Sequence, residues 1–382
     1  MIVIIGTGLA GYMLAKEWRK WDAVTPLTMV TESRGDFYSK PLLSTALTQQ
    51  KTAAQLALNN AADMAQQLNA VIYTETVVER INPAEKTISL AHTTLPYDKL
   101  ILACGSTPIH LNFSGNAAHD AISINNLEDY ARFRHWLEHN HKKQLAILGS
   151  GLVGCEFAND LLNRGYAIEM ISLDEYPLQK FIPEKIGHTL QQAFAEKGVQ
   201  WHFNVSAQSM DRQEGRYYVG LNNQLAVSAD GVLSAVGLRA NKTLASAAGL
   251  AVNQGIIVNR RLQTSVADIF ALGDCAEVLG HVKQYVAPLL QCARTLAKVL
   301  AGQEDEVHYP TMPIVIKTPA CPLVACPVPP GAEGEWHYSG DAKHLSALFY
   351  DAQKQLRGFA LIGDKVRDKL ELAKQLPLLF EE

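Results

Sequence analysis

Short runs of consecutive aliphatic residues alternate along this chain with longer segments in which apolar residues recur every three or four positions. The first run, MIVII, leads through a glycine-rich turn into a helically spaced segment from Tyr12 to Trp18, and LTMVTE follows over residues 27–32. Continuous apolar runs are typical of strands buried on both faces, whereas the longer repeat is typical of amphipathic helices. The pattern therefore predicts a strand–helix–strand unit with parallel strands.

The same unit recurs further along the chain. The stretch QLAILGSGLVGCEFANDLLNRGYAIEMIS, residues 144–172, repeats the order of strand, glycines, helix and strand. Each unit has a later return strand, within residues 95–108 and 228–241, and a third apolar run leads into Gly273 before a helical segment that starts at Tyr285. Shorter strands are expected around residues 335–339, 345–351 and 356–363, with a closing helix from Lys365. We therefore predict an α/β protein with two Rossmann-like modules and a small α+β C-terminal domain.

The first glycine cluster follows its strand directly and suits a dinucleotide pyrophosphate. Gly6 permits the tight turn, Gly8 lets the backbone approach the phosphates, and Gly11 lets the helix pack closely on the strand. Glu32 stands 21 residues after Gly11, where a carboxylate can accept hydrogen bonds from ribose hydroxyls. A lone cluster is a weak signal, but here the strand, the helix and the acid all stand in place. The predicted site also includes neighbours of these residues, namely Leu9, Ala10 and Ser33.

The second glycine cluster implies a second dinucleotide. It comprises Gly149, Gly151 and Gly154, and Asp174 follows its second strand. Small residues close the return strands, which lets the chain turn tightly beside a bound nucleotide: Ala103, Gly105, Ala235 and Gly237. Asp274, after the third run, belongs to the predicted site, although its alternative interpretation is a helix or turn cap.

Composition narrows the class of protein. Hydrophobic residues make up 48% and charged residues 19% of 382, which is ordinary for a globular enzyme. A formal net charge of −4 gives no reason to expect nucleic acid as a partner, and no apolar run approaches the roughly 20 residues of a membrane-spanning helix. The N-terminus shows no basic leader and the six cysteines are sparse, so we expect a cytoplasmic protein with reduced thiols.

Together these residues resemble the two-dinucleotide flavoprotein reductases of the glutathione-reductase class. In that class the first module holds FAD, the second, inserted module holds NAD(P)H, and a strand ending in Gly-Asp returns to the flavin. Segments similar to the rubredoxin–NAD+ reductase family are SKPLLS, NNLEDYARFR, GLVGCEFANDL, SAVGLR, LGDCAEV and IKTPACPLV. The similarity covers essentially the whole chain. It implies an FAD-binding domain at 1–107 and 239–309, an NAD-binding domain at 108–238, and a C-terminal domain at 310–382.

The resemblance also assigns catalytic roles. Lys40 is expected beside the hydride-accepting nitrogen of the flavin, with Glu156 as its ion-pair partner near the nicotinamide. Lys317 is expected at the pyrimidine end of the flavin, where a fixed cation stabilises the reduced ring. For either lysine, the alternative is a solvated surface side chain. Further contacts implied with FAD are Val78 at the adenine, Gly273 and Asp274 at the ribityl chain, and Val286 under the ring.

Two departures from common patterns bear on the nucleotide. Cys104 stands where relatives often have threonine, and Ser172 ends the second strand where many NADH users have Glu or Asp. Asp174 and Glu175 lie slightly later, and no arginine cluster replaces them. Because the extra phosphate of NADPH favours cations, we expect NADH.

Cys321 and Cys326 have the C-x-x-x-x-C spacing of the redox disulfide in flavin-dependent disulfide reductases. In those enzymes the pair faces the flavin from the helix after the second strand, which here is GDFYSKPLLSTAL and contains no cysteine. Prolines at 319, 322 and 327 favour extended chain around the two residues instead. We therefore expect two small core side chains rather than a redox pair.

Without an internal disulfide, electrons must leave the flavin directly, and flavin can release them singly. The resemblance makes the acceptor rubredoxin, as in pathways of alkane hydroxylation or oxygen detoxification. We expect a monomeric rubredoxin–NAD+ reductase with FAD, NADH and no metal of its own. The alternatives are an NADH:ferredoxin reductase, oxidase or peroxidase on the same fold, or an NADH-sensing flavoprotein without catalysis. A peroxidase of this type needs a cysteine within SKPLLS, and that segment has none.

Overall fold

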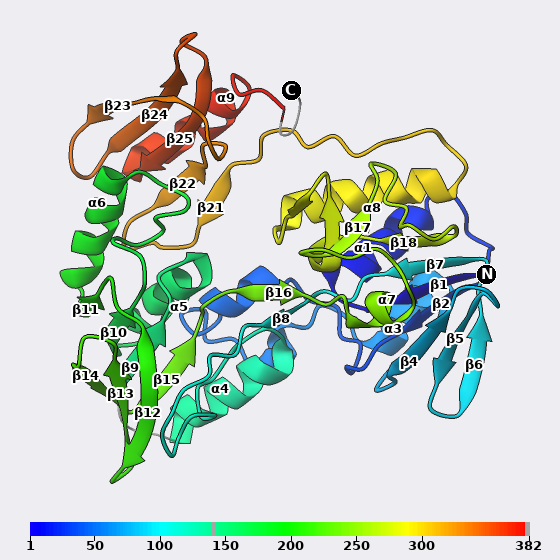
Figure 1. Ribbon diagram of the computed structural model, residues 1–382, viewed down its shortest axis with the longest axis horizontal. Coiled ribbons are helices and arrows are strands. Elements are labelled where there is room, and N and C mark those ends of the chain that lie inside the picture. Colours follow the sequence, from blue (N-terminus) through cyan, green and yellow to red (C-terminus); the bar gives the residue numbers. More distant parts are fainter. Residues whose placement is uncertain (140–142, 379–382) are drawn as a thin grey trace.

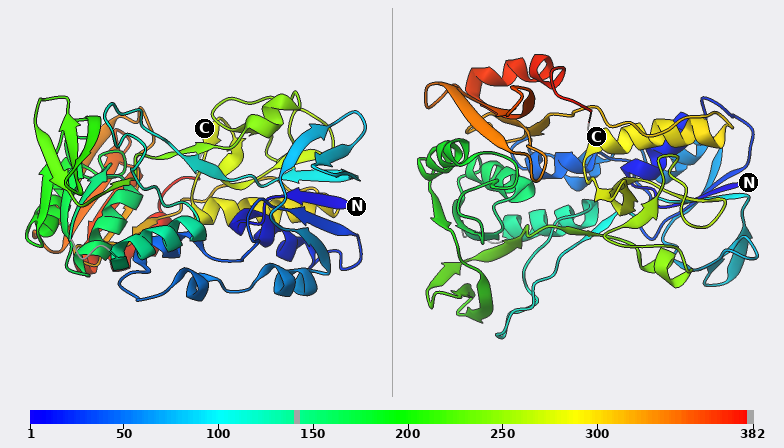
Figure 2. Two further views of the ribbon diagram at one scale, coloured as in Figure 1. Left: turned by 90° about the horizontal axis from the view of Figure 1, so that it is seen from below. Right: turned by 45° about the horizontal axis from the view of Figure 1, so that its top comes forward.

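The computed structural model describes residues 1–139 and 143–378, which form two parallel-sheet modules and a C-terminal domain (Figure 1). The first module contains the N-terminus and occupies one end of an elongated molecule. The second module and the C-terminal domain lie side by side at the other end, as both views of Figure 2 show.

The first module is built on a parallel five-stranded sheet. Its strand order is β18-β7-β1-β2-β3, and β1 pairs with both β2 and β7 along its whole length. The helices α1 and α8 pack against each other beside this sheet. The bounds are β1 Ile2–Ile5, α1 Leu9–Trp18, β2 Leu27–Val30, β3 Ala70–Tyr73, β7 Lys99–Leu102, β18 Ile269–Ala271 and α8 Val286–Leu300.

Smaller elements complete the first module. Two three-stranded sheets flank the main one, in the orders β4-β5-β6 and β17-β19-β20. Their bounds are β4 Val78–Asn82, β5 Thr87–Leu90, β6 Thr93–Pro96, β17 Ile256–Val258, β19 Ala276–Val278 and β20 His281–Val282. The short helices are η1 Lys40–Thr45, α2 Ala53–Leu56, α3 Ala61–Leu68, α7 Thr243–Ala247 and η2 Gly273–Cys275.

The second module repeats the plan with a parallel four-stranded sheet in the order β11-β10-β9-β15. An antiparallel meander in the order β12-β13-β14 packs against this sheet through a shared hydrophobic cluster. The bounds are α4 Leu127–His139, β9 Gln144–Leu148, α5 Leu152–Leu162, β10 Ala167–Ile171, α6 Glu184–Ala195, β11 Val199–His202, β12 Ala207–Gln213, β13 Arg216–Leu221, β14 Ala226–Ala229 and β15 Gly231–Ser234.

Two antiparallel strands carry the chain from one module to the other and back. They are β8 Ser106–Pro108 and β16 Leu238–Ala240, and Figure 1 shows them between the two parallel sheets. The second module is therefore inserted in the first. The predicted boundaries after residues 107 and 238 fall within these strands, and the boundary after 309 falls just before β21; all three stay predictions.

The C-terminal domain follows an extended segment that runs from α8 across the molecule (Figure 1). It is an antiparallel sheet in the order β21-β22-β25-β24-β23. Its elements are β21 Ile314–Ile316, β22 Leu323–Cys326, β23 Gly334–Gly340, β24 Leu345–Asp351, β25 Leu356–Ile362, η3 Gly363–Asp368 and α9 Lys369–Ala373. The closing helix predicted from Lys365 is thus a 3-10 turn that becomes α-helical only at Lys369.

The hydrophobic core does not follow the module boundaries. One cluster fills the first module, around residues of β1, β7 and α8. A second cluster joins α5 and α6 of the second module to β22, β24 and β25 of the C-terminal domain, and it includes Leu43 of η1. The second module and the C-terminal domain therefore share one interior. The predicted α/β architecture is confirmed, and within the described residues no helix is long and apolar enough to cross a membrane.

Candidate functional site

A cavity of about 2560 Å³ runs between the two modules and reaches the C-terminal domain. Single-ligand pockets usually measure about 300–1,000 Å³, so this cavity has room for more than one ligand. Most of the predicted site residues line it: Gly6, Gly8, Leu9, Ala10, Glu32, Ser33, Lys40, Val78, Ala103, Gly105, Gly149, Gly151, Glu156, Asp174, Gly237, Asp274, Val286 and Lys317. Gly11, Gly154 and Gly273 lie behind this wall, where they pack against neighbouring backbone or side chains.

The first glycine cluster fits a dinucleotide because its middle residue faces open space. Gly6 has φ +110°, and a Cβ on it would collide with the carbonyl oxygen of Ala103. A Cβ on Gly11 would collide with the Gly6 carbonyl oxygen, so α1 packs directly on the turn. Gly8 caps α1 without a side-chain hydrogen bond, and a Cβ on it would meet no atom within 4 Å. The N–H groups of the first helical turn therefore remain available to a pyrophosphate.

The second glycine cluster reproduces this geometry. Gly149 has φ +101°, and a Cβ on it would lie 2.6 Å from the Ala235 carbonyl oxygen. Gly154 packs against Gly149, while Gly151 caps α5 without a side-chain hydrogen bond and faces open space. Each parallel sheet therefore presents one helix N-terminus to the same cavity. The residues present fit two dinucleotides.

Polar residues stand at the rim of the first glycine cluster, where an adenosine is expected. Glu32 is exposed just beyond β2, and Ser33 shares a 3.0 Å hydrogen bond between hydroxyl oxygens with Thr31. Val78 opens β4 on the same side of the cavity. Their roles at the ribose and the adenine stay predictions.

Asp274 and Lys40 lie together on the first module's side of the cavity. Asp274 belongs to η2, directly after β18, and accepts a hydrogen bond from the Ser106 hydroxyl at 3.0 Å. The Lys40 ammonium lies 3.8 Å from the Asp274 carboxylate. Burial lowers the pKa of Lys40, and the nearby Asp274 partly opposes that shift. Asp274 is thus fixed by two partners, beyond what turn capping alone requires.

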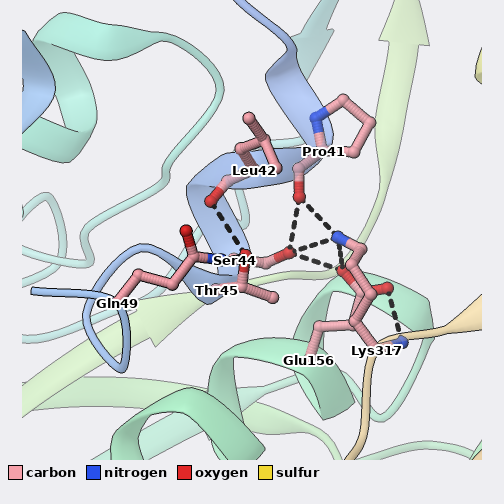
Figure 3. A network of polar contacts seen from close by, with 7 residues as sticks. All are labelled: Pro41, Leu42, Ser44, Thr45, Gln49, Glu156 and Lys317. Carbon is pink, nitrogen blue, oxygen red and sulfur yellow. Dashed lines mark hydrogen bonds and ion pairs between the residues drawn. The ribbon is translucent and has the colours of Figure 1, made fainter. Parts of the chain in front are cut away.

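The predicted ion pair between Lys40 and Glu156 is wrong. Glu156 lies on α5 and pairs with Lys317, whose ammonium nitrogen is 2.6 Å from Glu156 Oε2 (Figure 3). The backbone N–H of Lys317 donates to the other carboxylate oxygen at 3.1 Å. Lys40 starts η1 and turns to Asp274 instead, because the segment that ends in Lys317 occupies the place beside Glu156.

Ser44, which the sequence did not single out, completes this contact. Its hydroxyl donates to Glu156 Oε2 and lies 2.8 Å from the Lys317 ammonium, which also donates to the Pro41 carbonyl (Figure 3). Three parts of the chain therefore meet here: η1 of the first module, α5 of the second module, and the end of strand β21 in the C-terminal domain. The sequence signal for Ser44 was present in SKPLLS, but a serine in an apolar run has no distinctive spacing.

Two further polar residues of α5 strengthen the same junction. Asp160 accepts the backbone N–H groups of Leu47 at 3.0 Å and Thr48 at 2.8 Å, just past η1. Burial raises the pKa of Asp160, against the lowering effect of the Thr48 hydrogen bonds. Asn159 accepts the backbone N–H of Ala320 at 3.0 Å. Asn159 and Asp160 lie three and four positions after Glu156, so one face of α5 holds both neighbouring segments.

Asp174 is held by two buried serines at the edge of the second nucleotide site. Its backbone N–H donates to the Ser172 hydroxyl at 3.1 Å, and the hydroxyl groups of Ser150 and Ser172 lie 3.4 and 3.3 Å from its carboxylate. Ser172 therefore orients the acid that follows it. A fixed carboxylate beyond β10 favours ribose hydroxyls over a phosphate.

Cys321 and Cys326 do not face each other. Cys321 packs in the core shared with the second module, whereas Cys326 belongs to a separate cluster with Phe359. Both are buried free thiols, and burial raises the pKa of Cys321 to about 11 and of Cys326 to about 12. Cys326 ends β22, whereas Cys321 precedes that strand in a turn, where its backbone N–H donates to the Thr318 carbonyl at 2.8 Å. The spacing therefore does not make a pair here.

Comparison with known proteins agrees with this layout. The family model of pyridine nucleotide-disulphide oxidoreductases matches residues 1–297, and that of the rubredoxin binding C-terminal domain matches residues 306–376. Among curated proteins the chain is 42% identical to a rubredoxin-NAD(+) reductase of Alcanivorax borkumensis over 380 residues, covering 99% of each chain. It is 40% identical to the same-named protein of Acinetobacter baylyi over 386 residues, covering 99% and 98%.

A solved ferredoxin reductase from Rhodopseudomonas palustris has the same fold. It superimposes with a TM-score of 0.88 at 23% identity, over 97% of this chain and 92% of that one. The match extends across both modules and the C-terminal domain.

Proposed function

Because the chain belongs to the pyridine nucleotide-disulphide oxidoreductase family, and within it to the rubredoxin–NAD+ reductases, we propose that it is an FAD enzyme that oxidises NADH and reduces rubredoxin. The proposal rests on two observations together. One cavity contains two nucleotide cradles, by which we mean the two glycine turns with the N-termini of α1 and α5, and the C-terminal domain belongs to the rubredoxin-binding family. Either cradle alone would fit many oxidoreductases.

FAD, when bound, accepts two electrons from NADH and releases them one at a time. Residues of both modules would hold the two nucleotides for this electron transfer. The α1 N-terminus and Gly8 would hold the FAD pyrophosphate, and Asp274 with Lys40 would border the ribityl chain and ring. The α5 N-terminus and Gly151 would hold the NADH pyrophosphate, and Glu156, further along α5, would lie on the nicotinamide side. The Glu156–Lys317 pair then forms the wall where the two nucleotides meet.

The proposal includes a monomer that works in the cytoplasm. Reduced rubredoxin would serve an alkane hydroxylase or an oxygen-detoxifying pathway.

The test is NADH-driven reduction of cytochrome c, measured with and without added rubredoxin. Rubredoxin should raise the rate many-fold, while ferredoxin in its place should not. If added rubredoxin does not change the rate, or if ferredoxin raises it equally, the broader alternative of a ferredoxin reductase or oxidase on this fold would be favoured. Purified protein without FAD would exclude both.

A further inference from the structure

The hydrogen-bonding capacity of the Lys317 ammonium is fully used by protein acceptors. Its three protons match three neighbours: the Pro41 carbonyl, the Ser44 hydroxyl at 2.8 Å and Glu156 Oε2 at 2.6 Å (Figure 3). Glu156 accepts two hydrogen bonds from Lys317, one from the ammonium and one from the backbone N–H. The pair is therefore held in one orientation.

Ser44 decides that orientation because a hydroxyl has a single proton. Two acceptors compete for this proton: the Pro41 carbonyl at 3.2 Å and the charged Glu156 Oε2. The carboxylate is the stronger acceptor, and the ammonium of Lys317 already occupies a lone pair of the hydroxyl. Ser44 is consequently a donor to Glu156 and an acceptor from Lys317 at once. It is only 5% exposed, so water cannot easily replace it.

The position of Ser44 links it to the hydride donor. Its helix η1 begins with Lys40, which contacts Asp274 on the flavin side of the cavity. Its partner Glu156 lies in the first turns of α5, five residues past Gly151 on the nicotinamide side. Ser44, Glu156 and Lys317 all line the cavity. The hydroxyl thus fixes the part of the cavity wall that lies between the two nucleotide sites.

We propose that Ser44 is a positioning residue for hydride transfer from NADH, acting through Glu156 and Lys317. This inference rests on the proposed function. Without the hydroxyl, Glu156 Oε2 loses one donor and the ammonium loses one acceptor, so both side chains gain rotational freedom. A misplacement of about 1 Å in such a wall can slow a transfer step by up to about a hundredfold. Electron delivery to rubredoxin takes no hydride from the nicotinamide, so its rate should change far less.

The test compares Ser44→Ala with Thr45→Val as a matched control in the full-length, FAD-loaded protein. Thr45 is the next residue of the same helix, but its hydroxyl donates to the Leu42 carbonyl at 3.2 Å and stays outside the cavity wall. Anaerobic stopped-flow reduction by NADH gives the limiting rate and the NADH affinity separately. Ser44→Ala should lower the limiting rate about tenfold, or about 1.4 kcal/mol, with little change in affinity. Thr45→Val and the rate of reoxidation by rubredoxin should stay at the wild-type level.

A second measurement separates positioning from a general structural role. If Ser44 acts through Glu156, then Ser44→Ala should add little further loss in a Glu156→Gln background, because residues of one network are not additive. The flavin midpoint potential and the urea unfolding midpoint of each variant serve as readouts independent of turnover. If Ser44→Ala does not load FAD, Ser44→Cys keeps the shape with a weaker donor and should show an intermediate loss.

An unchanged limiting rate in Ser44→Ala, an equal loss in Thr45→Val, or additive losses with Glu156→Gln would each overturn the inference. Failure of the proposed function has a different signature. In that case NADH would fail to reduce the flavin of the wild-type protein, whatever stands at position 44.

Discussion

At the scale of single residues, the charge of Lys317 has a measurable consequence for the flavin. Lys317→Met would leave the Glu156 carboxylate without its cation in the cavity wall. An unbalanced negative charge disfavours adding electrons to a nearby flavin, so the midpoint potential should fall. A contact worth about 1–3 kcal/mol corresponds to a fall of tens of millivolts, since about 30 mV equals 1.4 kcal/mol for two electrons. A spectroscopic redox titration measures it.

Two companion variants sharpen that prediction. Lys317→Arg keeps the charge and should recover part of the potential, although its planar group cannot match all three acceptors. Lys317→Met combined with Glu156→Gln removes both charges and should return the potential toward the wild-type value. An unchanged potential in Lys317→Met would mean that the pair does not act on the flavin electrostatically.

The residue that should set the choice of nucleotide is Asp174. Its carboxylate is oriented by Ser150 and Ser172, so it would face the adenosine ribose and repel a phosphate there. Asp174→Asn should therefore reduce the preference for NADH over NADPH by about tenfold, or about 1.4 kcal/mol. The readout is the ratio of flavin reduction rates with each nucleotide. Glu175→Gln is the control and should leave the ratio unchanged.

At the scale of elements, the glycine turns separate ligand binding from folding. Gly8→Ala adds a methyl group to open space, so the protein should fold normally but retain FAD at least about tenfold more weakly. Gly6→Ala forces a positive φ and a collision with Ala103, so it should also lower the unfolding midpoint. FAD release followed by fluorescence, alongside urea unfolding, distinguishes the two. Gly8→Ala with full FAD retention would contradict the pyrophosphate cradle.

The thiols at the end of β22 and in the turn before it can be tested directly. Replacing Cys321 and Cys326 together by Ala should leave turnover within a few-fold of wild type, at a cost of about 1–3 kcal/mol in stability. Alanine is chosen because a buried serine hydroxyl would lack a partner. Turnover per bound FAD is the quantity to compare. Loss of activity in a folded, FAD-loaded double variant would mean that the thiols take part after all.

How much of the structure the sequence predicts depends on how far apart in the chain the interacting residues lie. Strands, glycine turns and the return strands follow from local patterns, and the structure has β1, β9 and β18 where the apolar runs lie. Gly8 and Gly151 each cap a helix and line the cavity, and their contacts with a nucleotide stay predictions. Local pattern is sufficient there because the turn and the helix that it starts are contiguous.

Pairings between distant segments could not be read in the same way. The resemblance implies Lys40 as the partner of Glu156, but the partner in the structure is Lys317, and that choice depends on the path of the segment that reaches Lys317. The same holds for Ser44, whose importance comes from a helix 112 residues away. The shared core of the second module and the C-terminal domain was also not evident. Apolar periodicity shows which face of an element is buried, but not which other element it packs against.

At the scale of the whole molecule, the hydrophobic core shared by the second module and the C-terminal domain should make these two parts unfold together. Leu323 of β22 is buried in it, and Leu323→Ala should cost about 2–5 kcal/mol. Amide hydrogen exchange should then speed up in α5 and α6 as well as in β22, with a smaller effect on β1. Faster exchange confined to the C-terminal domain would show that the two parts unfold separately.

The position of β18 has a consequence for how the protein is made. As the chain emerges from the ribosome, β1, β2, β3 and β7 appear early, but their outer neighbour β18 is encoded after the entire second module. Until residues 269–271 emerge, β7 keeps an unpaired edge, and η2 and α8 are absent from the cradle. The second module is contiguous and can close its own parallel sheet first. FAD therefore acquires its complete binding surface late in translation, after the nucleotide site for its electron donor has already formed.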